Sequence, residues 1–532
     1  MAMRAAFLMA FAPACAPESE PPADAADAVD AADSAAAVDP TPLDPVRLLA
    51  RRSLDLRGIR PTPAEIRAVE ADASQLDVLT ESYTLDPAFP SRMAWLWNDA
   101  IHTAVWGPSL GLFGELEFPQ WHAMGQEPLR VIQVVIDEDR PFTDIVTTSQ
   151  GQVNDTLGAL YDVPGGGADW HWADYPDGRP TAGILSTRAF WMRYMADAVN
   201  FNRTRANAVA RIFLCADFLE REGGVSFDID ASSLAKVERA VAEEPACLTC
   251  HAALDPLASF MGGFAERSDE VPLDQFTRWS TFEADWYTAR QAPAWFGIPA
   301  RDLGDMGVML AADPRFESCA ARRFAAGMLG RRVDDLQEVA ELAALFAGNG
   351  HVVRPYVVQL VSRPDIMAAE ARVLTTEQLG SALVAFLGWG EGVLDTDGLM
   401  PLTWSPEHRV LGGGTDDDTV LLRAKSLGVG PAVLLEWTAR AAALPALEAD
   451  LARSPDDRVL YTVSGADASA PDEAAVRAQL TTWLLGAATL DVDPDGPEID
   501  GLLALYASQA TPLEGYTLAL QAVIRHPAVL VH

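Results

Sequence analysis

The chain has 532 residues, of which 49% are hydrophobic, so it can bury several cores and three or four domains are expected. Its formal net charge of −37 would repel nucleic acid and anionic membrane surfaces, which excludes both as expected partners. No apolar run reaches the roughly 18 residues that a membrane-spanning helix needs.

Residues 1–15 have the pattern of a short export signal. Arg4 supplies the positive end, an apolar stretch follows, and Ala14 precedes Cys15. This ending resembles the processing site of bacterial lipoproteins, which makes Cys15 the candidate lipidated residue. An ordinary cleaved signal and a wrongly assigned start codon are the alternatives. Both signal interpretations place the chain in the periplasm, at the outer membrane or on the cell surface.

Residues 16–45 are mostly Ala, Asp, Glu and Pro, and no basic residue occurs between Arg4 and Arg47. Such a segment cannot bury enough apolar surface to offset its ordering entropy. We therefore predict a disordered acidic tether that separates the folded part from the membrane.

Residues 46–175 are expected to form an N-terminal helical module. Thr62 and Glu65 have the spacing of a capping box, which predicts a helix start. A stripe at helical spacing predicts a core helix and makes His102 after it structural; its members are Met93, Leu96, Trp97, Ala100 and Ile101. The apolar run at residues 131–136 fits either a strand or a helix.

Residues 176–300 form the next predicted module. Residues 188–213 have one apolar face and are predicted to be helical, and residues 233–244 predict a second helix that leads to Cys247. The stretch from Cys247 to His251 then reads Cys-x-x-Cys-His. In this pattern two thiols form thioethers to haem and the adjacent imidazole binds the iron.

The sequence therefore predicts one covalent haem c, attached at Cys247 and Cys250, with His251 as the proximal iron ligand. A Cys247/Cys250 disulfide or redox dithiol and half of a zinc site are the alternatives. We expect the chain to turn away at Asp255-Pro256, where the Pro256 carbonyl could accept the His251 Nδ1 proton. For the sixth ligand the sequence offers His171, Met306 and Met309, whereas Met261 is too close along the chain, and packing roles compete with all of them.

Residues 301–370 and 371–532 are expected to form two further helical modules. Cys319 falls on a predicted helix and Cys215 ends an apolar run, so these two cysteines either form a disulfide or lie in separate cores. In the last module Thr375 and Gln378 have capping-box spacing, and residues 513–530 predict a closing helix. The acidic loop 412–418 is interpreted as a solvated turn, with Ca²⁺ binding as the alternative.

Several of these stretches resemble one family. The Cys-x-x-Cys-His stretch with Asp255-Pro256-Leu257 resembles the cytochrome-c-like domains of unknown function in planctomycete and myxobacterial envelope proteins. Residues 178–186 and 211–215 resemble the lead-in to those domains, and residues 51–65, 139–148, 313–333 and 513–530 resemble their flanking modules. The resemblance implies haem attachment and an envelope location, and it implies no substrate.

Together these patterns predict a mainly α, multi-domain protein with a cytochrome-c-like haem module and an acidic N-terminal tether. The predicted function is electron transfer or redox sensing with an unidentified redox partner or envelope protein, and any membrane contact would be through a lipid anchor. The alternative is a cofactor-free structural or binding protein of the envelope. No catalytic constellation rises above chance, so the sequence assigns no catalytic residue.

Overall fold

The computed structural model confirms a mainly helical, multi-domain protein. The structure describes residues 43–104, 118–163, 167–196, 201–220, 234–264, 278–365, 372–389, 406–424 and 426–532. The predicted signal, Cys15 and nearly all of the predicted tether lie outside these residues. Among the described residues, no helix has both the length and the apolar character needed to cross a membrane.

Four helices open the described chain: α2 (Pro45–Arg57), α3 (Pro63–Ala71), α4 (Gln75–Thr84) and α5 (Ala88–Ile101). The capping box predicted from Thr62 and Glu65 is present at the start of α3. Gly58 ends α2 with a φ of 71°, a left-handed conformation that favours glycine. Local signals therefore set the limits of these helices.

The next segment contains α6 (Phe118–Asp137), α7 (Asp155–Tyr161), α8 (Arg188–Arg193) and the 3₁₀ turns η1 (Phe142–Val146) and η2 (Gly183–Ser186). The run at residues 131–136, which the sequence left open, is helical and lies within α6. Strands β1 (Gly151–Val153) and β2 (His171–Ala173) pair antiparallel, with Gln152 opposite Trp172.

The continuous helix predicted over residues 188–213 is wrong, because α8 ends at Arg193 and α9 begins at Arg203. The carbonyls of Trp191 and Tyr194 instead accept hydrogen bonds from the buried side chain of Arg205, at 3.3 and 3.1 Å. Arg205, from the next helix, thus occupies carbonyls that would accept backbone hydrogen bonds in a longer α8. A pattern of apolar residues cannot predict such a contact.

The middle of the chain continues with α9 (Arg203–Phe213), α10 (Leu234–Glu243), α11 (Pro245–Ala258), the 3₁₀ turn η3 (Ser259–Met261), α12 (Thr281–Arg290), the short hairpin β3 (Ala294–Trp295) and β4 (Ile298–Pro299), α13 (Leu303–Ala311), α14 (Pro314–Leu329), α15 (Leu336–Gly348) and α16 (Val353–Leu360). Helices α14 and α15 pack against each other, and α14 also contacts α5. Helices α13 to α16 lie in residues 301–370, which were predicted to be helical.

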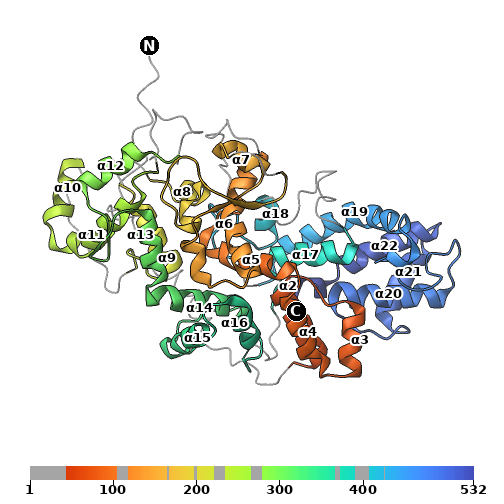
Figure 1. Ribbon diagram of the computed structural model, residues 1–532. Helices are drawn as coiled ribbons and strands as arrows, with labels where there is room; N and C mark the ends of the chain where they lie inside the picture. The colour runs from red at the N-terminus through yellow and green to blue at the C-terminus, as the bar shows by residue number, and fades with distance from the viewer. Residues whose placement is uncertain are drawn as a thin grey trace, which may run out of the picture.

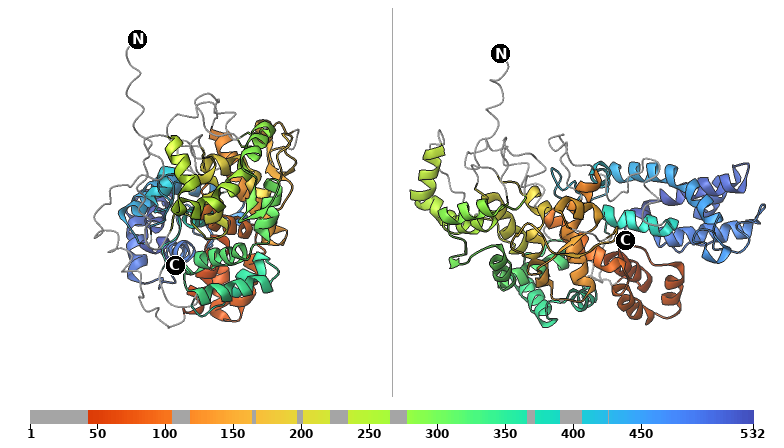
Figure 2. Two further views of the ribbon diagram at one scale, coloured as in Figure 1. Left: turned by 90° about the vertical axis from the view of Figure 1, so that its left-hand side faces the viewer. Right: turned by 45° about the horizontal axis from the view of Figure 1, so that its top comes forward.

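The C-terminal part comprises α17 (Thr376–Leu387), α18 (Pro406–Leu411), α19 (Val429–Leu451), the 3₁₀ turn η6 (Pro455–Asp457), α20 (Glu473–Ala488), α21 (Pro497–Ala507), α22 (Pro512–Ile524) and the 3₁₀ turn η7 (Pro527–Leu530). The capping box of Thr375 and Gln378 is present, and α22 with η7 accounts for the predicted closing helix. Figures 1 and 2 show α19–α22 at one end of an elongated molecule and α10–α12 at the other.

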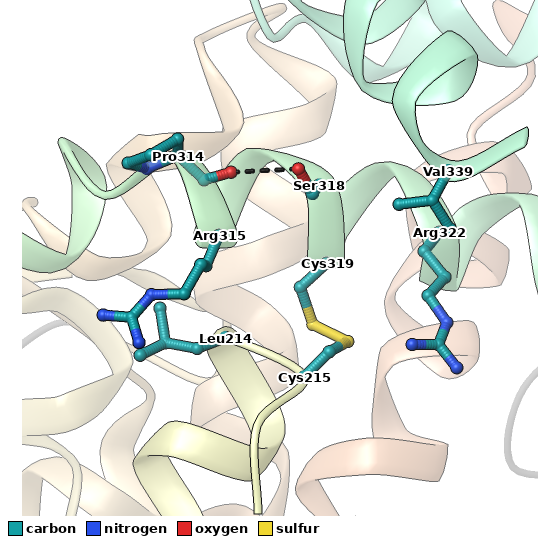
Figure 3. Close-up of a pocket in the computed structure, with 8 residues that line it drawn as sticks. All are labelled: Leu214, Cys215, Pro314, Arg315, Ser318, Cys319, Arg322 and Val339. Carbon is teal, nitrogen blue, oxygen red and sulfur yellow. Dashed lines mark hydrogen bonds between the residues drawn. A yellow bond between two sulfur atoms is a disulfide. The ribbon is translucent and has the colours of Figure 1, made fainter. Parts of the chain in front are cut away.

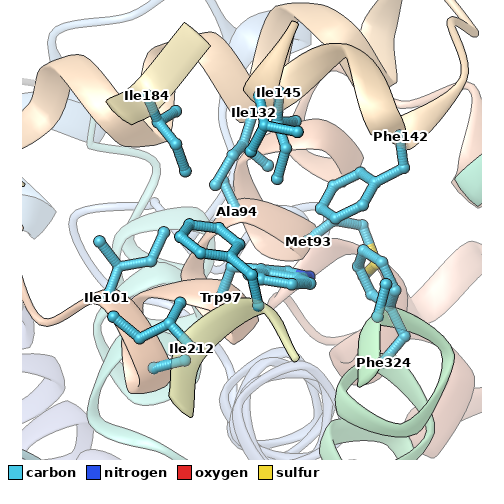
Figure 4. Close-up of a cluster of buried hydrophobic side chains, with 14 of the residues drawn as sticks. Met93, Ala94, Trp97, Ile101, Ile132, Phe142, Ile145, Ile184, Ile212 and Phe324 are labelled. Carbon is cyan, nitrogen blue, oxygen red and sulfur yellow. The ribbon is translucent and has the colours of Figure 1, made fainter. Parts of the chain in front are cut away.

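Two large hydrophobic clusters hold these helices together. The first comprises residues between Leu49 and Val361 together with Leu485. It contains aromatic side chains in contact, such as Trp97 and Phe142, whose rings are tilted with their centroids 4.9 Å apart (Figure 4). The second comprises residues between Leu374 and Leu530 together with Leu54 of α2. Helix α2 contributes to both, so the N-terminal helices join the two cores.

Candidate functional site

Helix α11 carries the Cys-x-x-Cys-His stretch. Pro245 occupies the first turn, where its missing N–H costs no helical hydrogen bond. Cys247 and Cys250 are therefore one helical turn apart, and His251 follows directly. Helix α11 packs against α9, α10 and β3, close to one end of the molecule (Figure 1). Cys247 is buried, whereas Cys250 and His251 are half-buried.

A carboxylate on the same helix fixes the His251 ring. The Nδ1 atom of His251 lies 2.9 Å from Oδ1 of Asp255, and Arg203 of α9 binds both oxygens of that carboxylate at 2.7 and 3.0 Å. Burial raises the pKa of Asp255, but hydrogen bonds from His251 and Arg203 outweigh this effect and lower the pKa. The Asp255 carboxylate can only accept in this hydrogen bond, so Nδ1 is the donor and Nε2 is the ring nitrogen left for a ligand.

Two sequence expectations about this helix are wrong. The chain does not turn away at Asp255-Pro256, because α11 continues through Pro256 to Ala258. The partner of His251 is the Asp255 carboxylate and not the Pro256 carbonyl. The residue before a proline normally avoids the helical conformation, but here the ion pair with Arg203 holds Asp255 on the helix.

Cys250 contacts the backbone of Phe218, whose ring belongs to an aromatic pair. Its Sγ lies 3.8 Å from the carbonyl oxygen of Phe218, and the Phe218 ring stacks on Phe296 with centroids 6.3 Å apart and an interplanar angle of 7°. The guanidinium of Arg315 lies 4.1 Å above the other aromatic partner, Phe296. The motif helix is therefore in contact with segments that come from two other parts of the chain.

The residues of α11 fit covalent haem c. Two cysteines one turn apart can reach two vinyl groups, and His251 has its Nδ1 engaged, as metal-binding histidines usually do. Leu248 on the same helix and Leu219 beside Phe218 are exposed apolar side chains, at 39% and 77%. Within the described ranges, no group of three or more His, Cys, Asp or Glu side chains could hold a metal ion.

The candidates for a sixth ligand have other surroundings. His171 lies on β2, and its Nδ1 is 3.2 Å from the Asp169 carbonyl oxygen. Met261 and Met306 are fully buried in the first hydrophobic cluster, and Met309 packs against it. The structure therefore gives each of these four residues a packing or local role.

Cys215 and Cys319 are joined by a disulfide, with their Cα atoms 5.4 Å apart and a sequence separation of 104. The separation lies within the limit of about 7 Å for a bridge. The disulfide links the end of α9 to α14 (Figure 3).

A buried polar cluster around the carboxyl group of Glu127 was missed in the sequence. Glu127 of α6 is fully buried and accepts hydrogen bonds from the hydroxyls of Tyr161 and Tyr175, at 2.6 and 2.5 Å. Gly151 is required here, because a Cβ atom would lie 2.2 Å from the Tyr175 hydroxyl. Glu127 and Asp137 are both acidic residues of α6, and no local pattern in the sequence distinguishes the buried one.

The electrostatics of Glu127 are unusual for a carboxyl group. Burial raises its pKa to about 7, although the two tyrosine hydroxyls and the charges of Arg179 and Arg188 act in the opposite direction. Arg179 belongs to the stretch 178–186 that resembles the family lead-in, and its guanidinium lies 4.2 Å from the Tyr175 ring centroid. That stretch therefore helps to build the cluster.

The acidic loop 412–418 is not a solvated turn at Asp417, which corrects the sequence interpretation. Asp417 is fully buried and accepts two hydrogen bonds from Asn98 at 3.0 and 3.2 Å. His102, the residue after α5, lies 3.2 Å away from the same carboxylate. The prediction that His102 is structural agrees with this contact, which ties α5 to the C-terminal part.

A second buried ionic group lies next to this contact. Glu377 at the start of α17 pairs with Arg409 at 2.5 Å and with Arg423 at 2.7 Å. Arg423 also reaches Asp99 of α5 at 2.5 Å. These charged groups cross from the N-terminal helices to the C-terminal helices.

Comparison with protein-family models, curated proteins and solved structures gives no match. The family resemblance read from the sequence, and the haem attachment that it implies, therefore stay predictions.

Proposed function

We propose that this is an exported c-type haem protein that transfers electrons or senses redox state. Cys247 and Cys250 would hold the haem through thioethers, and His251 would bind the iron through Nε2. The observation that carries the proposal is the hydrogen bond from His251 Nδ1 to the Asp255 carboxylate. This hydrogen bond orients the His251 ring and leaves Nε2 as the nitrogen that can bind a metal.

The pairing of Asp255 with Arg203 supports the same role. A carboxylate hydrogen-bonded to a ligating histidine raises the basicity of the ligand, which favours the oxidised iron. Arg203 holds that carboxylate from a different helix through two hydrogen bonds, so the ring keeps its orientation. When bound, haem supplies a one-electron centre, and the protein residues determine its orientation and exposure.

The alternative is a cofactor-free envelope protein with a Cys247–Cys250 disulfide. The Cys215–Cys319 bridge is compatible with an oxidising compartment, which both proposals require. Helical positions three apart have Cβ atoms about 5–6 Å apart. A disulfide needs about 3.5–4.5 Å, so the first turn of α11 would have to tighten to form one. Cys-x-x-Cys pairs at helix starts also form disulfides in redox proteins, so the spacing is compatible with both proposals, and the hydrogen bond from His251 to Asp255 is what favours haem.

A spectrum tests the choice between these proposals. The full chain is produced with a haem-ligation system, and the expected result is a Soret band and a pyridine haemochrome with one haem per chain. Replacing both Cys247 and Cys250 with Ser should abolish covalent haem. The matched control, Ser at both Cys215 and Cys319, should keep it. A colourless wild-type chain that folds would contradict the haem proposal.

The location of the protein is tested separately through Cys15. If Cys15 carries lipid, Cys15→Ala should move the protein from the membrane fraction to the soluble fraction, because acyl chains supply the binding energy. Fractionation followed by immunoblotting measures this shift, with Cys215→Ala as the control that should stay in the membrane fraction. Equal partitioning of wild type and the Cys15→Ala variant would indicate an ordinary secretory signal.

A further inference from the structure

The Cys215–Cys319 disulfide lines an open pocket of about 300 Å³ on the surface of the described structure (Figure 3). Cys215 lies at the end of α9 and Cys319 on α14. The rest of the pocket wall combines apolar and basic side chains: Leu214, Pro314, Val339, Arg315, Arg322 and Ser318. A disulfide in such a position can be reached by a reagent without unfolding the core.

The two sulfur atoms differ in their surroundings. Cys215 is half-buried, whereas Cys319 is 1% exposed and its Sγ lies 3.5 Å from the carbonyl oxygen of Ile212. An attacking thiolate would therefore reach the Cys215 sulfur and release Cys319 as the leaving thiolate. Thiol–disulfide exchange is faster when the leaving thiol has a low pKa.

One arginine side chain shares a hydrogen-bond acceptor with the leaving sulfur. Arg323, one turn after Cys319 on α14, donates to the same Ile212 carbonyl at 3.0 Å and to the Arg211 carbonyl at 2.9 Å. Burial, followed by the charges of Arg211 and Arg322, lowers the pKa of Arg323 to about 10, so it remains cationic at neutral pH. In a chain with a net charge of −37, this positive group would stabilise a thiolate at Cys319.

The backbone at Cys215 also favours release of the bridge. Its φ of 50° is in the left-handed region, where glycine normally ends a helix. The N–H of Ala216 bonds the Ala210 carbonyl at 3.2 Å and completes this helix end. A residue with a Cβ atom is strained in that conformation, and opening the disulfide would let the segment relax.

The segment after Cys215 leads directly to the motif helix. Phe218 follows three residues later, and its carbonyl contacts Cys250. Its stacking partner Phe296 lies under Arg315, which lines the disulfide pocket. The bridge is thus connected to α11 through the chain and through packing.

We propose that Cys215–Cys319 is a redox-active disulfide whose substrate is a dithiol, and that its opening loosens the contact of Phe218 with the Cys-x-x-Cys-His helix. A dithiol thiolate attacks Cys215, forms a mixed disulfide and releases the Cys319 thiolate, which takes a proton. The second thiol of the reagent, as its thiolate, attacks the mixed disulfide and frees Cys215. Two electrons pass to the protein, and the dithiol leaves as its disulfide.

The exchange itself is independent of haem, and only its consequence for α11 rests on the proposed function. The folded full chain, prepared with and without haem, is treated anaerobically with dithiothreitol at neutral pH. N-ethylmaleimide quenches the reaction, and peptide mass mapping follows Cys215 and Cys319. We expect labelling of both residues while the helical circular dichroism is unchanged. Labelling only after denaturation would show a purely structural bridge and overturn the proposal.

Variants test the role of the arginine group. Loss of one positive charge should slow exchange about three- to tenfold in Arg322→Gln and in Arg323→Met, as expected for a leaving thiol whose pKa rises by one or two. Arg323→Lys should restore much of the rate. If Arg323→Met does not fold, the exchange rate of Arg322→Gln alone tests the role of the arginines, because the Arg322 side chain is partly exposed and its replacement should leave the fold intact. Unchanged rates in all variants would overturn the assigned leaving group.

Hydrogen exchange tests the connection to the motif helix. Reduced and alkylated chain should exchange faster than oxidised chain in peptides covering residues 214–220 and 245–258. Peptides from α20 serve as the internal control and should be unchanged. Unaltered exchange in α11 would overturn the connection, whereas a colourless preparation would affect only the haem proposal, because thiol labelling and hydrogen exchange need no chromophore.

Discussion

Glu127 shows how one buried carboxyl group can make stability depend on pH. Its pKa is raised by burial from an ordinary value of 4.5 to about 7. Between these values the folded state binds more protons than the unfolded state, so the free energy of unfolding falls as pH rises. A pKa change of this size corresponds to about 3 kcal/mol lost between pH 4.5 and neutral pH.

The variant Glu127→Gln should remove this dependence, because an amide stays neutral. We expect the variant to be about as stable as wild type at pH 5, apart from the mismatch of its NH₂ group with one tyrosine hydroxyl. Relative to wild type it should gain about 3 kcal/mol by pH 8. Urea unfolding at several pH values measures the difference.

Glu341→Gln is the matched control for this experiment, since Glu341 is an exposed residue of α15. Its difference from wild type should stay within about 0.5 kcal/mol at every pH. Parallel pH profiles for wild type and Glu127→Gln would show that Glu127 keeps an ordinary pKa.

At the scale of the helices, the sequence predicts what local contacts decide. The capping boxes at Thr62 and Thr375 were predictable because both partners lie within four residues. The end of α8 and the continuation of α11 through Pro256 were not predictable. They depend on hydrogen bonds from Arg205 and Arg203, which lie in another segment of the chain. Sequence reasoning therefore located the motif residues, but it assigned His251 the wrong partner.

The start of α17 is stabilised by a buried ion pair, and its loss should be costly. Burial raises the pKa of Glu377, but the charges of Arg409 and Arg423 outweigh burial and lower the pKa, so the group is ionised at neutral pH. Glu377→Gln would leave both guanidinium groups without this carboxylate. We expect a loss of about 3–5 kcal/mol in the free energy of unfolding, measured by urea titration at pH 7.

The pH dependence gives a second readout for Glu377. Because its folded-state pKa is lowered, its stabilisation is present above about pH 4.5 and is lost as pH falls below that value. The gap between wild type and Glu377→Gln should therefore narrow in acid. A gap that stays constant down to pH 3 would indicate a packing defect in the variant and not a lost ion pair.

On the scale of the whole molecule, the decisive contacts join residues that are far apart in sequence. Asn98 and Asp417 are 319 residues apart, and no sequence pattern predicts that the acidic loop contacts α5. The disulfide could be predicted only as one of two outcomes, because burial of two cysteines is compatible with pairing or with separate cores. Long-range pairs of this kind have no periodic signal.

The two hydrophobic cores are also joined by Arg60, which lies between α2 and α3. Its side chain is 7% exposed and donates to the carbonyls of Ala528, Val529 and Val531 at 3.0, 3.2 and 2.9 Å. These carbonyls belong to the last residues of the chain. The Arg60 guanidinium therefore holds the backbone of these last residues against the N-terminal helices.

Arg60→Met should weaken this connection by about 3 kcal/mol, because buried carbonyls would lose their donor. We expect the C-terminal helices to unfold before the N-terminal helices, so that thermal unfolding splits into two steps and limited proteolysis first cuts after residue 372.

Arg67→Met is the matched control: Arg67 also reaches the C-terminal part, through Asp491 at 3.0 Å, but both side chains are half exposed. An exposed ion pair contributes little, so this variant should differ from wild type by less than about 1 kcal/mol and unfold as wild type does. A single unchanged transition in Arg60→Met would show that the shared packing of α2, and not this guanidinium, couples the two cores.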